Sequence, residues 1–342
     1  MAATMRDVAA LAGVSVATVS RALAGSPLVG DDVRVRVKEA TESLGYVANR
    51  LPANLRGKGV RILALVVGNV RNAYFPELID GSVEAAREAG YPLIFGDSDE
   101  DPVRESEILE QLAAERVAGV ALATSVGPTS GLKRLMDLGI PVVAVDRRLQ
   151  GMQVDTVTID GEQGEYDAVQ HLIGLGHRRI GMMGGPIQLS TIADRERGYW
   201  RALADAGIEP DPSRVARGDL RDHTARDLAL RLMDRPDRPT AIVTINDLSS
   251  IGTLRALRAL GLKVPQDVSV VGFDDILGAE LYDPPLTVIA QPVYDIGQRA
   301  IELLARRVAT PDAGLEEVAF ATRLVVRGST GPVPGHQSLE EV

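Results

Sequence analysis

The stretch Thr4-Met-Arg-Asp-Val-Ala-Ala-Leu-Ala-Gly-Val-Ser-Val-Ala-Thr-Val-Ser-Arg21 decides the fold of the N-terminal part of the chain. Thr4 is a favourable N-cap, and Asp7 lies in the first turn of the helix that Thr4 begins. Gly13 can end that helix, and Ser15 caps a second predicted helix over residues 16–23. Two helices on so short a turn are typical of the helix-turn-helix arrangement, in which the second helix enters a major groove.

A third predicted helix over residues 31–44 completes a small bundle. Its apolar positions follow helical spacing and are Val33, Val37, Ala40 and Leu44. Gly45 is suited to end it, because glycine readily adopts the left-handed conformation found just past helix ends.

The second helix has two different faces. Val19, Ala22 and Leu23 share the arc that is expected to pack, and Val16, Ala17, Ser20 and Arg21 form the free arc. On that arc Arg21 can donate two hydrogen bonds to guanine, and Val16 and Ala17 can contact a thymine methyl group. The predicted DNA-binding residues here are Ser15, Val16, Ala17, Thr18, Ser20 and Arg21. The alternative is a purely structural helical hairpin.

Charge is distributed unevenly along the chain. Residues 1–58 contain eight Lys or Arg against five Asp or Glu, a net charge of +3, whereas the whole chain carries -10 and the remainder therefore -13. A small basic head on an acidic body favours a local contact with a polyanion. Chance fluctuation in a short window is the alternative explanation.

The N-terminal motif, followed by Gly45-Tyr-Val-Ala-Asn-Arg50 and Leu55-Arg-Gly57, closely resembles the headpiece of the lac-repressor/galactose-repressor family. The resemblance covers most of residues 4–58. It implies that Val16, Ala17 and Arg21 read bases. It also implies that Asn49 to Arg56 form a hinge helix that orders on operator DNA, with Leu55 wedged into the minor groove.

Physical chemistry supports a hinge that folds only on its partner. Asn49 can cap the segment, Pro52 is tolerated in a first turn, and the few remaining residues are too short for a stable isolated helix. Wedging Leu55 between bases costs about a few kcal/mol, which a kinked duplex offsets by contacting more protein. Asn49, Leu55 and Arg56 are the predicted DNA contacts of this segment. The alternative is a plain polar linker.

From residue 60 onward, short apolar runs alternate with amphipathic helical stretches such as residues 76–89 and 105–114. The runs lie at residues 61–67, 91–95, 117–123, 141–145, 179–183, 241–245 and 268–272. Near-continuous apolar runs are typical of parallel strands covered on both faces. The fold class predicted is therefore an all-α helix-turn-helix headpiece plus an α/β body of two doubly wound parallel sheets.

The family resemblance extends over this body and covers about 325 of the 342 residues. It implies a two-lobed, periplasmic-binding-protein-like domain, with chain crossovers near Gly161, Gln291 and residues 320–325. The predicted domains are a headpiece at 1–46, a hinge at 47–59, an effector-binding and dimerisation domain at 60–328, and a flexible tail at 329–342. The N-lobe comprises residues 60–160 and 292–321, and the C-lobe comprises 162–290 and 322–328. The tail lacks leucine heptads, which predicts a homodimer without a tetramerising coiled coil.

Polar or aromatic side chains follow several predicted strands, where ligands bind to open α/β sheets. The predicted effector-binding residues are Asn72, Tyr74, Phe75, Asp146, Arg147, Arg195, Leu220, Asn246, Asp274 and Gln291. An aromatic platform beside carboxylate, amide and guanidinium groups is typical of carbohydrate recognition. Taken singly, Asp146 and Arg147 have an alternative as a surface ion pair, and Asn246 and Asp247 as a helix N-cap.

The same positions resemble the ribose-repressor and ribose-binding-protein branch of the family. Leu220 lies where relatives often place an aromatic ring. The resemblance implies a monosaccharide effector, with a pentose such as ribose favoured over a hexose or a nucleoside. It also implies a repressor that binds pseudo-palindromic operator DNA and is regulated allosterically. The alternative is a sugar-binding receptor module without a DNA function.

Other function classes have little support in the sequence. There is no cysteine, and the four histidines include His171 and His177 without neighbouring thiolate ligands, so no metal site is predicted. Residues 181–185 lack the spacing of a dinucleotide fingerprint, and no nucleophile elbow is present. We predict no cofactor and no enzymatic activity. The absence of a signal-peptide pattern or a long apolar run predicts a cytoplasmic protein.

Overall fold

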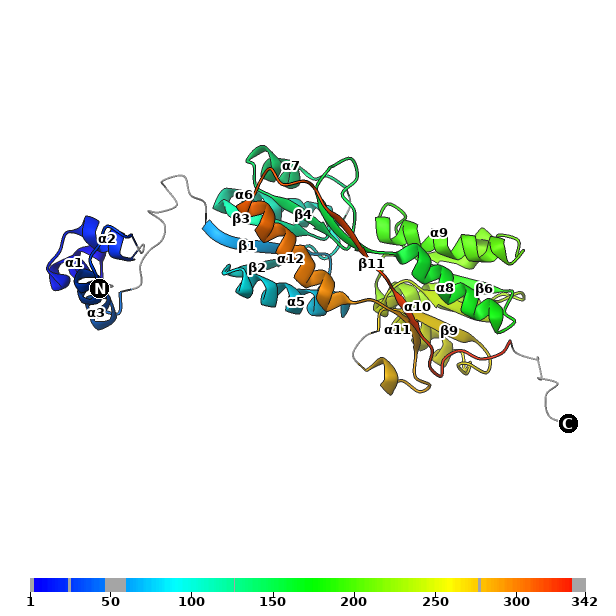
Figure 1. The fold of residues 1–342 in the computed structure, drawn as a ribbon. Helices are drawn as coiled ribbons and strands as arrows, with labels where there is room; N and C mark the ends of the chain where they lie inside the picture. Colours follow the sequence, from blue (N-terminus) through cyan, green and yellow to red (C-terminus); the bar gives the residue numbers. More distant parts are fainter. Residues whose placement is uncertain (1–2, 24–25, 47–59, 126, 276–277, 334–342) are drawn as a thin grey trace. The chain divides into compact units, whose positions relative to one another are not determined.

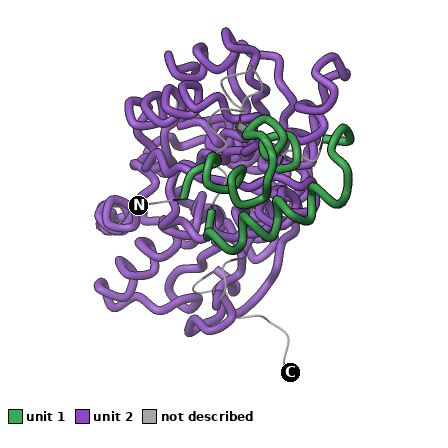
Figure 2. Tube along the Cα trace, turned by 90° about the vertical axis from the view of Figure 1, so that its left-hand side faces the viewer, with its two compact units in different colours: residues 1–59 green, residues 60–342 purple. Residues whose placement is uncertain are grey.

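The computed structural model describes residues 3–23, 26–46, 60–125, 127–275 and 278–333 (Figure 1). They divide into two compact units, residues 1–59 and residues 60–342, which Figure 2 colours separately. The predicted hinge contacts Asn49, Leu55 and Arg56 lie outside the described residues.

The first unit contains helices α1 (Met5–Ala12), α2 (Val16–Leu23) and α3 (Asp31–Ser43). Thr4 and Asp7 form a capping box, in which the Thr4 amide donates to Asp7 Oδ2 at 2.8 Å and the Asp7 amide donates to Thr4 Oγ1 at 3.4 Å. Gly13 ends α1 with a φ of 66°, and the Thr18 amide donates to Ser15 Oγ at 3.1 Å. Local capping thus fixes the short turn between the first two helices.

A small apolar core holds the three helices together. Val8, Val19 and Val37 are each no more than 1% exposed and come from α1, α2 and α3 respectively. Leu23 was expected on the packed arc but keeps 38% of its surface exposed. It is the last residue of α2, and from that turn only Ala22 packs against the core cluster.

The second unit is built on two six-stranded sheets. The first sheet, in lobe 1, has the order β11-β5-β4-β3-β1-β2, and its paired strands are all parallel. Its strands are β1 (Val60–Val67), β2 (Leu93–Asp97), β3 (Val117–Leu122), β4 (Val142–Val145), β5 (Asp155–Ile159) and β11 (Glu317–Phe320). This parallel sheet confirms the apolar-run prediction for lobe 1.

The second sheet, in lobe 2, has the order β12-β10-β9-β8-β6-β7, and only β12 runs antiparallel to its neighbour. Its strands are β6 (Ile180–Gly184), β7 (Val215–Arg217), β8 (Ala241–Thr244), β9 (Ser269–Phe273), β10 (Thr287–Ala290) and β12 (Arg323–Val325). The two sheets together give the α/β body that the sequence predicts.

Helices cover both sheets (Figure 1). Lobe 1 has α5 (Tyr74–Glu88), α6 (Pro102–Glu115), α7 (Ser130–Asp137) and α12 (Val293–Ala309). Lobe 2 has α8 (Gly161–Gly174), α9 (Ser190–Asp205), α10 (Asp222–Met233), α11 (Asp247–Ala259) and the short turns η1 (Pro212–Arg214) and η2 (Ala279–Leu281). A Cβ atom on Gly81 would lie 2.1 Å from the Tyr294 carbonyl oxygen, so glycine permits the close contact of α5 with α12.

The chain passes between the two lobes three times. It crosses from β5 to α8, from β10 to α12, and from β11 to β12. These passages lie beside Gly161, Gln291 and residues 320–325. Three short connections next to one another make a hinge about which two rigid lobes can close.

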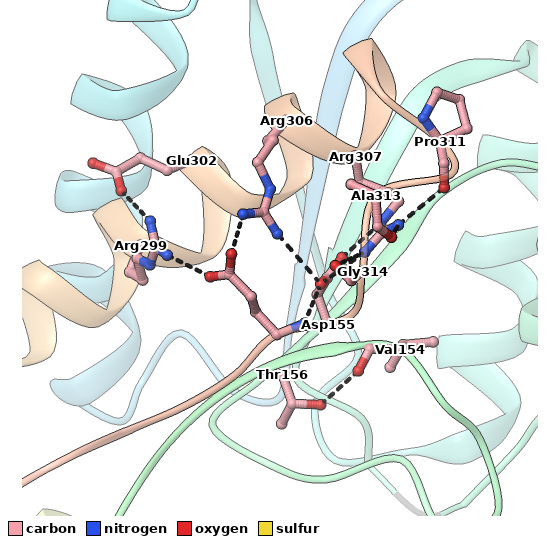
Figure 3. Close-up of polar contacts among 11 residues, drawn as sticks. Val154, Asp155, Thr156, Arg299, Glu302, Arg306, Arg307, Pro311, Ala313 and Gly314 are labelled. Atoms are coloured by element: carbon pink, nitrogen blue, oxygen red, sulfur yellow. Dashed lines mark hydrogen bonds and ion pairs between the residues drawn. The ribbon is translucent and has the colours of Figure 1, made fainter.

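A charged cluster fixes the end of α12 to the start of strands β5 and β11 in lobe 1 (Figure 3). Asp155, 1% exposed, accepts hydrogen bonds from Arg307 Nε and the Glu316 amide, both at 2.8 Å. Burial alone would raise the pKa of Asp155, but these hydrogen bonds and the arginine charges outweigh burial and lower it. Arg306 and Arg299 also pair with Glu316. The cluster anchors the helix that follows the second lobe crossing.

The prediction of a flexible tail from residue 329 is wrong for its first five residues. The Ser329 hydroxyl is buried, donates to the Val270 carbonyl at 2.6 Å and accepts from the Thr287 amide at 2.7 Å. The Gly331 amide donates to Ser269 Oγ at 3.0 Å, and the Val333 amide donates to the Leu175 carbonyl at 3.1 Å. Lobe 2 therefore extends through Val333, and residues 334–342 lie outside the described residues.

Candidate functional site

The candidate nucleic-acid face of the first unit lies on α2. Val16 is 42% exposed, Ala17 and Arg21 are also exposed, and Val19 on the opposite side is buried. Ser20 is half-buried, and the Ser15 and Thr18 hydroxyls hydrogen-bond to each other at 2.8 Å. Small apolar side chains beside a free guanidinium suit a base-reading surface. The DNA contacts themselves stay predictions.

The second unit contains a cavity between its two lobes, and all ten predicted effector residues line it. Further lining residues are Asn69, Glu100, Thr191, Ile192, Ile245 and Leu248. The free volume is about 30 Å³, comparable to the share of one water molecule in the liquid. The side chains of the two lobes thus nearly fill the cavity, and a larger ligand requires them to move apart.

Strained backbone gathers at this cavity. Among the described residues, six non-glycine residues have a left-handed φ, and four of them line the cavity. These four are Glu100 at 60°, Asp146 at 66°, Leu220 at 66° and Asp274 at 77°. Such conformations cost about 1–3 kcal/mol each and persist where the surrounding structure enforces them. Asp146 follows β4 and Asp274 follows β9, so the strain occurs where a strand ends at the cavity.

Lobe 1 contributes a buried arginine that is already paired. Arg147 Nη1 donates to Glu100 Oε2 at 2.7 Å and to the Thr124 carbonyl at 2.8 Å, and Nη2 donates to Glu100 Oε1 at 2.8 Å. Arg147 Nε also lies 3.3 Å from Asp146 Oδ2. Arg147 and Asp146 are therefore an ion pair, as the alternative interpretation held, but a buried one rather than a surface pair.

Burial and neighbouring charges compete at these two groups. Burial opposes the charged guanidinium, but the Glu100 carboxylate outweighs it and raises the pKa of Arg147. Burial also raises the pKa of Asp146, against the opposing influence of Arg147 and Arg195. The lobe 1 side of the cavity thus holds one cation that is matched by carboxylates at short range.

Lobe 2 contributes Arg195 from α9 and Asp274 from the end of β9. Arg195 Nη1 donates to the Ile245 carbonyl, its guanidinium carbon lies 3.6 Å from the centre of the Phe273 ring, and its Nε has no hydrogen-bond partner. Gln291 Nε2 donates to Asp274 Oδ1. Burial raises the pKa of Asp274 to about 7, although Arg195 opposes that rise.

The two predicted amide residues also support the local backbone. Asn246 Oδ1 accepts from the Ser249 amide at 2.8 Å, so Asn246 is the N-cap of α11 as well as a cavity residue. Asn72 Oδ1 likewise accepts from the Tyr74 amide at 2.8 Å. Phe75 is 2% exposed and packs edge-on against Tyr74, with the ring centres 5.1 Å apart. The Tyr74 hydroxyl is buried without a hydrogen-bond partner.

Contacts between the lobes surround the cavity. Arg148 of lobe 1 pairs with Asp194 of α9, and its amide donates to Ser190 Oγ at 2.9 Å. On lobe 2, Arg221 lies 3.2 Å from Asp99 Oδ1, and the Asp247 carboxylate accepts from the Ala73 amide at 3.0 Å. These contacts hold the lobes in a closed arrangement.

Sequence reasoning missed Glu100, which binds Arg147 more directly than any predicted residue. A signal was present, because Ser98-Asp-Glu100 follows strand β2 in the same way that Asp146 follows β4.

Two family models match the chain. A lacI-family model of bacterial regulatory proteins matches residues 4–49, and a periplasmic-binding-protein-like domain matches residues 169–330. The repressor CytR of Escherichia coli (strain K12) is 34% identical over 334 residues, covering 97% of this chain and 98% of CytR. The regulator DegA of Bacillus subtilis (strain 168) is 31% identical and covers 97% of this chain and 99% of DegA.

Solved structures give the same picture. The complex of the transcriptional regulator CelR with cellobiose is 33% identical, covers 96% of this chain and 99% of CelR, and has a TM-score of 0.73. The lac repressor dimer bound to operator and an anti-inducer is 25% identical, covers 97% of this chain and all of the other, and has a TM-score of 0.85.

A ribose-bound regulator from Enterococcus faecium is 27% identical, covers 79% of this chain and 99% of the other, and has a TM-score of 0.73. The relatives named here are transcriptional regulators rather than enzymes. Within the described part of the chain, no helix is both long and apolar enough to cross a membrane.

Proposed function

This chain belongs to the lacI family of bacterial regulatory proteins, and from that premise we propose that it is a transcriptional repressor whose effector is a monosaccharide, a pentose such as ribose. The family consists of DNA-binding regulators controlled by small effectors. Two headpieces of a homodimer would read the two halves of a pseudo-palindromic operator. Residues 47–59 would supply the hinge that contacts the centre of that operator.

One observation carries the proposal for the effector. The cavity between the lobes brings together hydrogen-bonding side chains from both lobes with two buried aromatic side chains, Tyr74 and Phe75. Hydroxyl groups of a sugar can satisfy carboxylate, amide and guanidinium groups simultaneously, and the aromatic ring packs on its C–H face. A ligand that contacts both lobes stabilises the closed arrangement and so shifts the population of the regulator.

The preference for a pentose rests on the family resemblance and on one relative. A free volume of about 30 Å³ admits neither a pentose nor a hexose unless the lobes open. The Enterococcus faecium regulator carries bound ribose. The CelR complex with cellobiose favours the second candidate, a hexose-based effector.

The DNA-binding function is tested by selecting genomic fragments with the purified full-length protein. We expect one pseudo-palindromic sequence to be enriched and its binding to weaken steeply with salt. Arg21→Ala should lose about 1–3 kcal/mol of discrimination at one guanine in each half-site. Lys38→Ala removes the same charge from exposed α3 and should leave base preference unchanged. A protein that binds all fragments alike would refute the repressor function.

The effector is identified by calorimetry against D-ribose, other pentoses, hexoses and nucleosides. We expect ribose to bind best and the variants Asp274→Ala and Arg195→Ala to lose that binding. Equal ribose binding by both variants and the wild type would exclude this cavity as the site. Family membership favours a sugar that weakens operator binding, and operator must then weaken sugar binding by the same factor.

A further inference from the structure

The cavity contains a carboxylate, Glu100, whose position is unusual. It lies just after β2 with a φ of 60°, and its side chain reaches both terminal nitrogens of Arg147 at 2.7 and 2.8 Å. A Cβ atom on Gly68 would lie 2.4 Å from Glu100 Oε1, so the glycine is needed for the carboxylate to occupy this place. The left-handed backbone of Glu100 and the absence of a side chain at Gly68 thus both allow the bidentate ion pair between Glu100 and Arg147.

This ion pair removes a free guanidinium from the cavity. A bidentate carboxylate occupies the fork of donors that would otherwise bind a phosphate. Arg195, the second arginine, faces the Phe273 ring and donates to a carbonyl, and the buried carboxyls of Asp146 and Asp274 both experience its charge. A dianionic group brought here would find the Arg147 donors occupied by Glu100 and would meet the carboxyls of Asp146 and Asp274, with Arg195 as the remaining cation among the described lining residues.

Two of the helix N-termini at the cavity, those of α5 and α11, are also occupied. Free amides at a helix start bind phosphate well. Here the Ser249 amide donates to Asn246, the Tyr74 amide donates to Asn72, and the Ala73 amide donates to Asp247. Side-chain oxygens therefore occupy amides at the starts of α5 and α11, independently of the Glu100 pair, whereas α9, whose Thr191 and Ile192 line the cavity, has no side-chain N-cap hydrogen bond.

We propose that Glu100 is a specificity-determining positioning residue: it holds and neutralises Arg147 so that the cavity accepts an uncharged sugar and rejects its phosphate. The proposal deepens the proposed function and rests on it. Arg147 can still offer its remaining donor capacity to a sugar hydroxyl, in an orientation that Glu100 fixes. The regulator would then respond to the free sugar before phosphorylation, not to the phosphoester that a sugar kinase produces.

The test compares D-ribose with D-ribose 5-phosphate by calorimetry on the full-length protein. The wild type should bind ribose at least about 100-fold more tightly than ribose 5-phosphate, because an unpaired charge in the cavity is costly. Glu100→Gln should weaken ribose binding about tenfold and strengthen ribose 5-phosphate binding about tenfold. Glu100→Asp keeps the charge but shortens the reach, so it should weaken ribose binding and still reject the phosphate.

Glu107→Gln is the matched control, because Glu107 is exposed on α6 and loses the same charge. It should change neither affinity. A wild type that binds ribose 5-phosphate as tightly as ribose overturns the proposal without any variant. So does a folded Glu100→Gln protein that keeps the wild-type preference. A wild type that binds ribose 5-phosphate and no free sugar refutes both this proposal and the proposed effector class.

Discussion

The two arginines of the cavity are equally buried but differently satisfied. Arg147 and Arg195 are each 5% exposed. Arg147 makes two hydrogen bonds to Glu100 and one to the Thr124 carbonyl. Arg195 makes a single hydrogen bond, to the Ile245 carbonyl, and within the described residues no carboxylate lies within ion-pair distance of it.

The difference separates two halves of the cavity: a fixed half on lobe 1, where Arg147 is already paired, and an available half on lobe 2, where Arg195 has no carboxylate partner among the described residues. On lobe 1 the protein itself supplies the partners of the guanidinium, so that side chain is held before a ligand arrives. The Nε atoms of both arginines are buried without a hydrogen bond, but Arg147 Nε lies 3.3 Å from Asp146 Oδ2, whereas Arg195 has no carboxylate within ion-pair distance among the described residues, and burying unsatisfied donors is costly. A ligand that bonds to Arg195 recovers this cost, so binding energy is expected mainly from lobe 2 and orientation mainly from lobe 1.

The largest expected effect is the difference in protein stability between variants that lack Arg147 and variants that lack Arg195. Arg147→Ala leaves Glu100 and Asp146 without their cation and should reduce the free energy of unfolding by about 3–5 kcal/mol. Arg195→Ala removes a donor that is mostly unsatisfied and should cost only about 1 kcal/mol. Urea unfolding monitored by circular dichroism measures both.

The same two variants can contradict the claim that Arg147 is held more firmly than Arg195. If Arg195→Ala destabilises the apo protein as much as Arg147→Ala does, the lobe 2 arginine is as firmly held as the lobe 1 arginine. Arg147→Ala combined with Glu100→Gln provides the control. Removing the second charge should restore part of the lost stability, because the buried carboxylate is then no longer unpaired.

Much of the fold could be predicted because its signals are local. The run at residues 61–67 became β1, and the Thr4 and Asp7 pattern became a capping box. Strands such as β7 and β12 escaped prediction because they are three residues long and contain arginine. Strand β5 escaped because Asp155, Thr156 and Thr158 interrupt its apolar pattern, although all three are buried, Asp155 and Thr156 with side-chain hydrogen bonds.

The sequence could predict which residues line the cavity, but not which partner each of them contacts. Parallel topology brings strand ends together, so residues such as Asp146, Asn246 and Asp274 were expected to meet, and they line one cavity. The partner of each residue depends on side-chain conformation and lobe closure, which no local pattern encodes. The pairing of Arg147 with Glu100 joins residues 47 positions apart.

The next effect concerns the lobe 2 half and its pH dependence. Burial raises the pKa of Asp274 from its ordinary 3.8 to about 7. Between those values the folded state binds a proton that the unfolded state lacks, so the Asp274 contribution to stability falls as pH rises toward 7. Asp274→Asn cannot ionise and should therefore gain on the order of 2 kcal/mol relative to the wild type between pH 5 and pH 8.

Unfolding measured across that pH range for both proteins checks the sign. Other buried carboxyls, such as Glu165 with a pKa raised by burial to about 8, titrate in both proteins and cancel in the difference. A stability difference that stays constant from pH 5 to pH 8 would mean that Asp274 does not titrate in this range, which contradicts a pKa raised to about 7.

The smallest effect tests how the two halves are held together. Arg148 pairs with Asp194 across the lobes, and its side chain is 39% exposed, so the pair should contribute about 0.2–1 kcal/mol. Because the pair exists only when the lobes are closed, Arg148→Ala should weaken ribose binding by about two- to fivefold while the unfolding of each lobe changes little. High salt should remove the difference between the variant and the wild type.

The control is Arg87→Ala, which breaks a more exposed ion pair with Glu84 inside α5 that spans no lobe boundary. It should leave ribose affinity unchanged at every salt concentration. If Arg148→Ala also leaves affinity unchanged, closure is driven by the ligand contacts of Arg195 and Asp274 alone. In that case the lobe 2 half of the cavity, rather than the ion pair between Arg148 and Asp194, sets the position of the two lobes.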